Sequence, residues 1–278
     1  MIKIVSWNIQ WGRGADGRVD LRRTAELLQG LDPHVICLQE VAVNMHGLAG
    51  AAPEDGVARL CSMLPGYIFA FAPAVDVANQ QGERMYFGNL TLSRLPIGQV
   101  WRHLLPWPAD PTVPAMQRAC LELVLNAPNN PIRILNTHLE YYSKSIRLAQ
   151  AGRLVELQRE AEALARTPST NKDNNPAFKA LPRPEKALLC GDMNCEPSTS
   201  AHKRLSDEGV WHDAWPLVHG TRAHAPTVGL HGAEWPKHPY CCDYFFVSNV
   251  IQTLVKRIQV IEDTAASDHQ PILLELEV

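Results

Sequence analysis

The chain has 278 residues, of which 46% are hydrophobic and 20% charged, as is ordinary for a soluble globular protein with enough apolar material for a sizeable core. The formal net charge is −3, so the overall basic excess of many duplex-binding proteins is absent, although a local basic patch is compatible with this total. No apolar stretch approaches the length that spans a bilayer, and the N-terminus shows no signal-peptide pattern.

Short runs rich in Val, Ile, Leu, Phe and Tyr, bounded by Gly, Pro or Asn, predict β-strands along the whole chain. Apolar residues at helical spacing predict several helices between them. In chain order we expect strand 2–6, helix 20–30, strand 34–39, helix 53–64, strands 67–72, 85–92, 118–125 and 132–137, helix 143–166, strand 187–190, helix 198–208, and strands 243–248, 255–261 and 271–277.

Strands outnumber helices and often follow one another directly, which predicts mixed or antiparallel sheets with helices packed outside in layers. Residues 104–114 carry four prolines, and residues 167–184 are rich in Asn, Pro and Lys. We expect surface loops at both places, the second partly disordered. Because strand patterns resume on both sides of each loop, we expect one domain covering residues 1–278.

The cysteine pattern argues against both disulfide bridges and a thiolate zinc site. There are seven cysteines, an odd number, and no Cys-x-x-Cys pair. Cys241 and Cys242 are adjacent, and most of the others lie inside apolar runs. We therefore expect reduced thiols in a cytoplasmic protein.

Six short segments place polar side chains at the end of an apolar run, where a rigid strand holds catalytic groups in place. They are Ser6-Trp7-Asn8, Leu38-Gln39-Glu40, Asn136-Thr137-His138-Leu139, Gly191-Asp192-Met193-Asn194, Cys242-Asp243-Tyr244 and Ser267-Asp268-His269. Glu40 and Asp268 are hard oxygen ligands suited to Mg²⁺ or Mn²⁺. Hydrolysis of a phosphate ester needs such a cation, a base for water, and donors to the developing charge.

The remaining polar residues fit the other roles. Asp192 is a candidate to orient or deprotonate water, and Asn194 would share its side of an extended segment and donate to a phosphate oxygen. His138 and His269 are candidate donors to the phosphate. A buried carboxylate such as Asp243 can hold one of these histidines in its cationic form.

Taken in order, the six segments resemble the endonuclease/exonuclease/phosphatase superfamily, and the resemblance covers the chain from Asn8 to His269. Residues 85–97 also resemble the central strand and turn of that family. The resemblance implies a four-layered α/β sandwich, with two mixed sheets packed face to face and helices outside. It also implies in-line attack by water without a covalent intermediate.

The resemblance assigns roles to eight residues. It implies that the main metal, Mg²⁺ or Mn²⁺, lies among Asn8, Glu40 and Asp268. Asp192 would position the attacking water with Asn194 beside it, Asp243 would pair with His269, and His138 would touch the scissile phosphate.

The chain departs from the family pattern at Cys241-Cys242, where many members have Arg-Ile before the aspartate. A cation near the site is therefore missing, and Arg118, Arg147 and Lys237 are the candidates to replace it. Trp107 and Trp235 lie beside prolines in predicted loops, which makes them candidate substrate contacts. Arg118, Arg147, Trp107 and Trp235 form the predicted substrate-binding set.

Each polar residue alone has a structural alternative. Asn8 is compatible with a turn former, Asp192 with an Asx turn, and the histidines with satisfied core residues. Six more histidines lie in the last third of the chain: His202, His212, His219, His224, His231 and His238. They are compatible with a second metal site or with surface and loop positions. Their spacing matches no ligand motif, which favours surface and loop positions.

We therefore predict a divalent-metal-dependent hydrolase of phosphate esters, and within this class a phosphodiesterase. The acidic balance, and the absence of a Lys- and Arg-rich insertion, favour a small-molecule or lipid-headgroup diester. A DNA or RNA nuclease is the alternative, and a non-catalytic binding protein on the same fold ranks below both. No stable protein partner is indicated.

Overall fold

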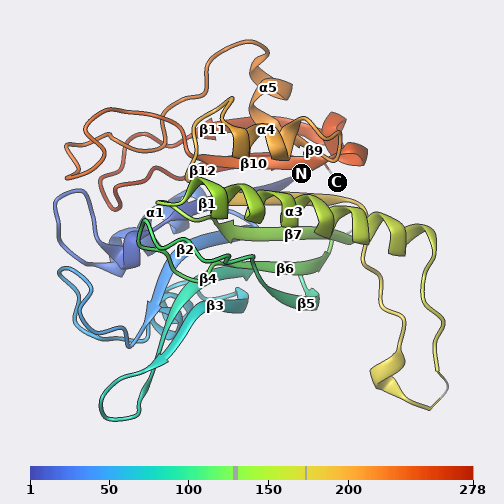
Figure 1. Cartoon of the computed structure of the whole chain (residues 1–278), viewed down its shortest axis with the longest axis horizontal. Helices are drawn as coiled ribbons and strands as arrows, with labels where there is room; N and C mark the ends of the chain where they lie inside the picture. The colour runs from blue at the N-terminus through green and yellow to red at the C-terminus, as the bar shows by residue number, and fades with distance from the viewer. Residues whose placement is uncertain (128–130, 173, 278) are drawn as a thin grey trace.

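Two six-stranded sheets face each other at the centre of the molecule, and helices cover the outer face of each (Figure 1). The computed structural model describes residues 1–127, 131–172 and 174–277. One sheet has the strand order β11-β12-β1-β2-β4-β3, and the other β5-β6-β7-β8-β10-β9. This arrangement confirms the predicted four-layered α/β sandwich with two mixed sheets.

The elements have the following bounds. The first sheet contains β1 (Ile2–Asn8), β2 (Val35–Val43), β3 (Ile68–Ala78), β4 (Arg84–Ser93), β11 (Val255–Val260) and β12 (Ile272–Leu276). The second contains β5 (Ile97–Leu104), β6 (Ala119–Asn126), β7 (Pro131–His138), β8 (Ala187–Asp192), β9 (Trp211–Asp213) and β10 (Asp243–Ser248). The helices are α1 (Leu21–Leu31), α2 (Gly56–Met63), α3 (Lys144–Arg166), α4 (Ser200–Ser206) and α5 (Ala214–His219), with 3₁₀ turns η1 (Gln10–Gly12), η2 (Pro176–Phe178) and η3 (Asn249–Leu254).

Three apolar clusters hold the layers together. The inner faces of the two sheets meet in the largest, to which Ile4, Leu123 and Phe245 contribute. A second lies between the first sheet and α1 and α2, and a third between the second sheet and α3 and α4. Burial of this apolar surface is the main favourable term that keeps the two sheets face to face.

All ten predicted strands and all four predicted helices are present, with shifted ends. The sequence missed β5, β9 and α5. In β5, exposed and partly buried residues alternate along an edge strand that carries Arg102 and His103, so its apolar signal is weak. β9 and α5 are too short, at three and six residues, for a periodic pattern.

The prediction of surface loops at 104–114 and 167–184 is correct over most of both segments. Leu104 ends β5 and so does not belong to the first loop. The segment 167–184 has no strand among its described residues and contains only the short turn η2; residue 173 of this loop lies outside the described part of the chain.

The strand order brings the polar strand ends to one edge of both sheets. β1 runs parallel to β2, and β7 runs parallel to β8, while the other paired strands are antiparallel. The carboxyl ends of a central parallel pair are the usual place for a ligand in such sheets. Here each sheet contributes one such pair, and the two pairs end next to one another.

A buried polar link joins the two sheets directly beneath that edge. The Nε2 atom of Gln39 donates to Oδ1 of Asn136 across the interface at 2.7 Å, and both side chains are fully buried. Asn136 Nδ2 in turn donates to the carbonyls of Leu38 and Leu90. Because an unsatisfied buried amide is costly, these bonds fix how the two sheets register on each other.

All seven cysteines are free of disulfide bonds in the described structure, as the sequence predicted. Among the described residues, the helices include none that is both long enough and apolar enough to cross a membrane.

Candidate active site

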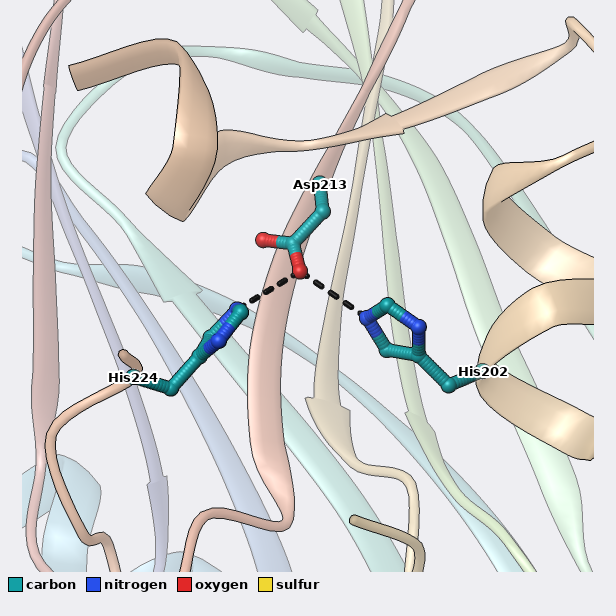
Figure 2. Close-up of side chains that lie close together, drawn as sticks. All are labelled: His202, Asp213 and His224. Atoms are coloured by element: carbon teal, nitrogen blue, oxygen red, sulfur yellow. Dashed lines mark hydrogen bonds and ion pairs between the residues drawn. The ribbon is translucent and has the colours of Figure 1, made fainter. Parts of the chain in front are cut away.

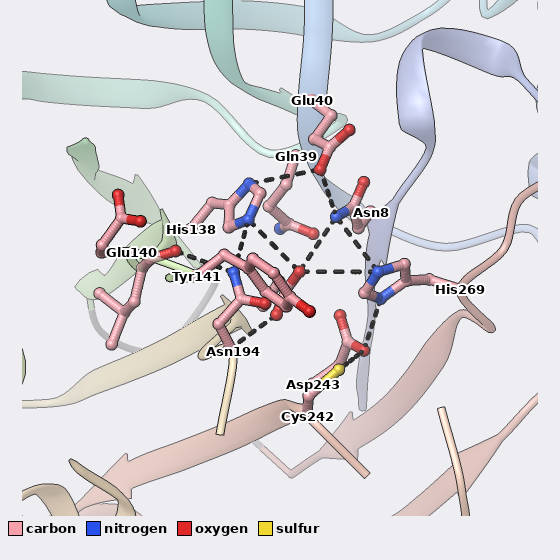
Figure 3. Close-up of polar contacts among 12 residues, drawn as sticks. Asn8, Gln39, Glu40, His138, Glu140, Tyr141, Asn194, Cys242, Asp243 and His269 are labelled. Atoms are coloured by element: carbon pink, nitrogen blue, oxygen red, sulfur yellow. Dashed lines mark hydrogen bonds and ion pairs between the residues drawn. The ribbon is translucent and has the colours of Figure 1, made fainter. Parts of the chain in front are cut away.

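Polar residues of four central strands, three of them at the strand end, converge with two further segments into one cluster (Figure 3). Asn8 ends β1 and His138 ends β7, while Glu40 lies within β2. Asp192 ends β8, and Asp243 begins the antiparallel neighbour β10 directly opposite it. His269 lies in the segment that precedes β12.

Asn8 joins the residues from the two sheets. Its Nδ2 atom donates to Oε1 of Glu40 and to Oδ2 of Asp192, each at 3.1 Å, and lies 3.5 Å from Nε2 of His269. The turn considered from sequence is also present, but Asn8 is buried and its Nδ2 atom points into the cluster. Its Oδ1 atom accepts from the backbone N–H of Gln10.

Glu40 sits where the regular pairing of β2 is interrupted. The register between β2 and β4 shifts between Leu38 and Val41, and the backbone of Glu40 has a φ of 57°, an uncommon value for a residue with a side chain. Burial, together with the nearby Asp268 charge, raises the pKa of Glu40 to about 7. A bulge that holds a carboxylate in an unfavourable environment is typical of a functional site.

Asp268 is the second carboxylate of this pair. Burial raises its pKa above the ordinary aspartate value. Its Oδ2 atom accepts from Nε2 of Gln10 at 2.8 Å. Sequence reasoning missed Gln10, which bridges Asn8 and Asp268 from the left-handed turn η1; its position two residues after Asn8 was the only available signal.

The segment of His269 is anchored to β1. Nε1 of the buried Trp7 donates to the carbonyl of His269 at 2.9 Å, and Oγ of Ser267 donates to the carbonyl of Asn8 at 2.8 Å. These two bonds join positions some 260 residues apart in the chain. They explain why Asp268 and His269 reach the cluster although they lie outside a strand.

Asp192 depends on the glycine before it. Gly191 has a φ of 135°, and a Cβ atom there would lie 1.8 Å from the carbonyl oxygen of Thr137 on β7. Only glycine allows β8 to approach β7 this closely. Asp192 Oδ1 accepts from the backbone N–H of Asn194 at 2.8 Å, which is the Asx turn considered from sequence, while Oδ2 faces the cluster.

The predicted extended geometry for Asn194 is wrong. β8 ends at Asp192, and Asn194 has a φ of 48°, so the chain turns instead of continuing as a strand. The turn carries the amide of Asn194 to His138, with 2.9 Å between Nδ2 and Nε2, and to the carbonyl of Leu139 at 2.9 Å. Asn194 is therefore in the cluster, but a turn brings it there.

The two histidines have opposite electrostatic environments. Burial and the charge of Arg118 lower the pKa of His138 to about 3, so this imidazole is neutral. Burial opposes a charge on His269 as well, but the carboxylates of Asp243 and Asp192 outweigh it and raise the pKa well above the ordinary histidine value. Nδ1 of His269 lies 2.9 Å from Oδ2 of Asp243, which makes His269 the histidine held as a cation.

Asp243 is itself held by a threonine that sequence reasoning missed. Oγ1 of Thr227 donates to Oδ2 of Asp243 at 2.6 Å and accepts from the backbone N–H groups of Cys242 and Asp243. Thr227 is fully buried. No motif in the sequence marks it, because it is brought to Asp243 only by the path of the loop before β10.

Of the candidate cations, Arg118 is beside the cluster and Arg147 is not free. Arg118 is buried, lines a small cavity with Glu40 and His138, and lies 3.6 Å from Glu140 without a hydrogen bond at its Nε atom. Arg147 donates to the backbone carbonyls of Glu140 and Tyr141. It therefore braces the segment after β7.

The two candidate tryptophans differ in their surroundings. Trp235 is 43% exposed and meets the ring of Tyr141 edge-on, with centroids 5.2 Å apart. Its other neighbour is Tyr240, at 6.1 Å, whose pKa is raised by burial and by Cys242 and Asp192. We call Tyr141, Trp235 and Tyr240 the aromatic ledge. Trp107 is 51% exposed in the segment between β5 and β6 and does not belong to it.

The arrangement is suited to hydrolysis of a phosphate ester, and the fold is that of the DNase-like hydrolases. The chain belongs to the Endonuclease/Exonuclease/phosphatase family, whose sequence model matches residues 5–269. Members of this family are phosphoester hydrolases that use divalent metal ions.

Solved structures agree with this assignment at the level of the fold. An endonuclease/exonuclease/phosphatase from Beutenbergia cavernae is 23% identical with a TM-score of 0.68, the match covering 100% of this chain and 71% of that one. The mannosyl-6-phosphatase Bt3783 of Bacteroides thetaiotaomicron (18%, TM-score 0.69) and the 3′ phosphatase NExo from Neisseria, bound to a product DNA hairpin (18%, TM-score 0.65), match over 100% of both chains. A comparison with curated proteins found no significant match.

Proposed function

We propose that this protein is a phosphodiesterase that depends on Mg²⁺ or Mn²⁺ and cleaves its substrate by in-line attack of water, with residues 1–278 acting as one catalytic domain. The observation that carries the proposal is the pair of half-buried carboxylates, Glu40 and Asp268, beside Asp192 and a cationic His269. Burial raises the pKa of both carboxyls of the pair, so their charged forms are unfavourable without a cation.

The donor set fits a hard divalent ion. Glu40 and Asp268 supply carboxylate oxygens, and Asn8 lies next to Glu40 with an amide that can rotate to present its oxygen. When bound, Mg²⁺ or Mn²⁺ would neutralise the charge of the phosphate and the leaving oxygen. Gln10 holds Asp268 in place through the 2.8 Å bond to its Oδ2 atom.

The protein's own groups supply the remaining chemistry. Asp192 presents Oδ2 to the cluster and would orient water and accept its proton. His269, kept cationic by Asp243, would donate from Nε2 to a phosphate oxygen. The neutral His138, whose Nε2 accepts from Asn194, would donate from Nδ1 to the same phosphate group. Asn194 would hold His138 in place, and Arg118 would add the positive charge that Cys241-Cys242 does not provide.

The charge of the site favours a diester over a monoester. A diester carries one negative charge and a terminal monoester up to two. Besides the proposed metal ion, which Glu40 and Asp268 would largely neutralise, positive charge comes from His269 and from Arg118, which already pairs with Glu140. The described carboxylates around the cluster are Glu40, Glu140, Asp192, Asp243 and Asp268. A site with this charge balance stabilises a monoanionic phosphate more readily than a dianionic one. Separately, the net charge of −3 for the whole chain favours a small or lipid diester over nucleic acid.

The testing experiment is a panel of phosphate esters assayed with Mg²⁺ or Mn²⁺ and then with EDTA. It includes bis-p-nitrophenyl phosphate, supercoiled plasmid, single-stranded DNA, RNA, a phosphomonoester and phospholipids. We expect turnover of small or lipid diesters that EDTA abolishes and added Mg²⁺ or Mn²⁺ restores. Turnover of plasmid or RNA would identify a nuclease instead. Hydrolysis that survives EDTA would contradict the proposed mechanism.

The aromatic ledge gives a prediction about substrate binding. Trp235→Ala should raise KM roughly fivefold or more with little change in kcat, because an exposed ring next to the site contributes binding that is equal in ground and transition states. Phe178→Ala, which removes another exposed ring on η2, serves as the control and should leave KM unchanged. Trp107→Ala tests the other tryptophan predicted from sequence. An unchanged KM in Trp235→Ala would show that the aromatic ledge does not contribute to substrate binding.

A further inference from the structure

A second polar cluster, with no part in the chemistry above, lies on the outer side of the second sheet. His202 comes from α4, Asp213 ends β9, and His224 belongs to the loop between α5 and β10. Figure 2 shows the two imidazoles pointing at one carboxylate from opposite sides. Nε2 of His202 lies 2.9 Å from Oδ2 of Asp213, and Nε2 of His224 lies 2.7 Å from the same oxygen.

The three ligand atoms are close enough to share one ion. They all lie within 4.8 Å of one another. In a tetrahedral zinc site with bonds of about 2.0–2.1 Å, neighbouring ligand atoms are about 3.3 Å apart. Both Asp–His separations are already within about half an ångström of that value, and a small rotation of either imidazole adjusts the rest.

The carboxylate is held in this orientation by its other oxygen. Oδ1 of Asp213 caps α5 by accepting from the backbone N–H of Trp215 at 2.9 Å. His202 and Asp213 are buried, and the side chain of His224 is only 12% exposed. One buried carboxylate and two largely buried imidazoles, each held by a different element, are a built ligand set.

An open position remains for a further ligand. The cluster faces a surface cavity of about 460 Å³, whose lining includes His202, Asp213 and His224 together with Ser198 and His212. Catalytic and exchangeable zinc sites commonly keep three protein ligands and one water. The cavity gives that water access to the ion.

We propose that His202, Asp213 and His224 bind a transition-metal dication of the zinc type, separate from the catalytic Mg²⁺ or Mn²⁺. Two imidazole nitrogens with one carboxylate are the donors that Zn²⁺ prefers, whereas Mg²⁺ requires an oxygen set. The bound ion replaces the hydrogen bonds to Asp213 by coordination through the Nε2 lone pairs.

Such an ion would also act on the loop that supports the active site. His224 and Thr227 lie three residues apart, and Thr227 holds Asp243, which pairs with His269. Zinc at His224 would tie this loop to α4 and β9. We therefore expect zinc to raise the thermal stability of the metal-free protein, because a ligand that binds only the folded state stabilises it.

The test measures bound zinc in EDTA-treated protein that has been dialysed against equimolar Zn²⁺ in excess Mg²⁺, which competes for the catalytic carboxylates. We expect about one equivalent of zinc in the wild type and in His212→Asn, which changes another histidine lining the same cavity. His224→Asn should lose that equivalent and its zinc-dependent rise in Tm. Glu40→Gln should keep both, since it alters only the catalytic site.

Zinc retained in His224→Asn, or absent from the wild type, would overturn the proposal. Circular dichroism establishes that each variant is folded. Should His224→Asn not fold, Co²⁺ added to the wild type in excess Mg²⁺ decides the question. Intense visible d–d bands of a four-coordinate ion support the site, and their absence overturns it.

Discussion

Asp192→Asn is expected to lower kcat for a phosphodiester by about 10³-fold, within the range that loss of a positioned general base or water-orienting group produces. The amide cannot accept a proton from water through the atom that replaces Oδ2. The turn should persist, because asparagine has the same shape and its Oδ1 can still accept from the N–H of Asn194, while the bond that Oδ2 accepts from Asn8 is lost. Initial rates at saturating substrate and metal measure the change.

Two accompanying measurements separate this role from a structural one. The Tm and the Mg²⁺ affinity of Asp192→Asn should stay close to those of the wild type, since Glu40 and Asp268 are the proposed carboxylate ligands. Asp263→Asn, a change at an exposed position, should leave kcat unaltered. A variant of Asp192 that keeps more than about a tenth of the wild-type kcat would refute the assigned role.

The largest effect on stability is expected from Glu122→Gln, a change outside the active-site cluster. Glu122 on β6 is fully buried among cations. Its carboxylate accepts two 2.8 Å bonds from Arg183, lies 2.8 Å from Nε2 of His103, and lies 3.0 Å from Nε of the fully buried Arg133. Removing the charge leaves Arg133 buried without its counter-ion, which costs about 3–5 kcal/mol of unfolding free energy.

Chemical denaturation of wild type and variant at neutral pH measures this loss. Glu160→Gln is the matched control, because Glu160 also pairs with Arg183 but is 45% exposed, and its loss should cost less than about 1 kcal/mol. A cost for Glu122→Gln no larger than that of the control would show that the buried cluster contributes little.

The pKa of Glu122 predicts how the difference in unfolding free energy between the wild type and Glu122→Gln depends on pH. Burial alone would raise the pKa of Glu122, but the bonds from Arg183 and His103 and the charge of Arg133 outweigh it and lower the pKa to about 2 from the ordinary 4.5. A depressed folded-state pKa contributes stability above the unfolded value, and this contribution is lost as pH falls towards the folded value. The stability gap between wild type and Glu122→Gln should therefore narrow between about pH 4.5 and pH 2.

Much of the fold follows from short-range sequence patterns. Apolar runs with strand composition mark ten of the twelve strands in the described part of the chain, and polar residues at or near their ends mark most of the proposed site between Asn8 and His269. Local sequence carries this information because strand propensity and the alternation of burial act within a few residues. The order of the six motifs indicates the family, and membership of the family implies the two-sheet arrangement.

Other features depend on contacts that no local pattern encodes. Gln10 and Thr227 join the site only because a left-handed turn and a loop path bring them to Asp268 and Asp243. Arg147, a candidate for substrate binding, is instead engaged with two backbone carbonyls.

The clearest contrast is between Asp192 and the second cluster. The sequence places Asp192 because a strand end points its side chain to a known edge of a sheet. His202, Asp213 and His224 belong to a short helix, a three-residue strand and a loop, none of which fixes a side-chain direction by periodicity. Local sequence thus identifies which residues can do chemistry and which strands hold them. Which of these residues meet is a property of the folded molecule, because it depends on strand order, turn conformation and loop path, and these are set by packing between distant parts of the chain.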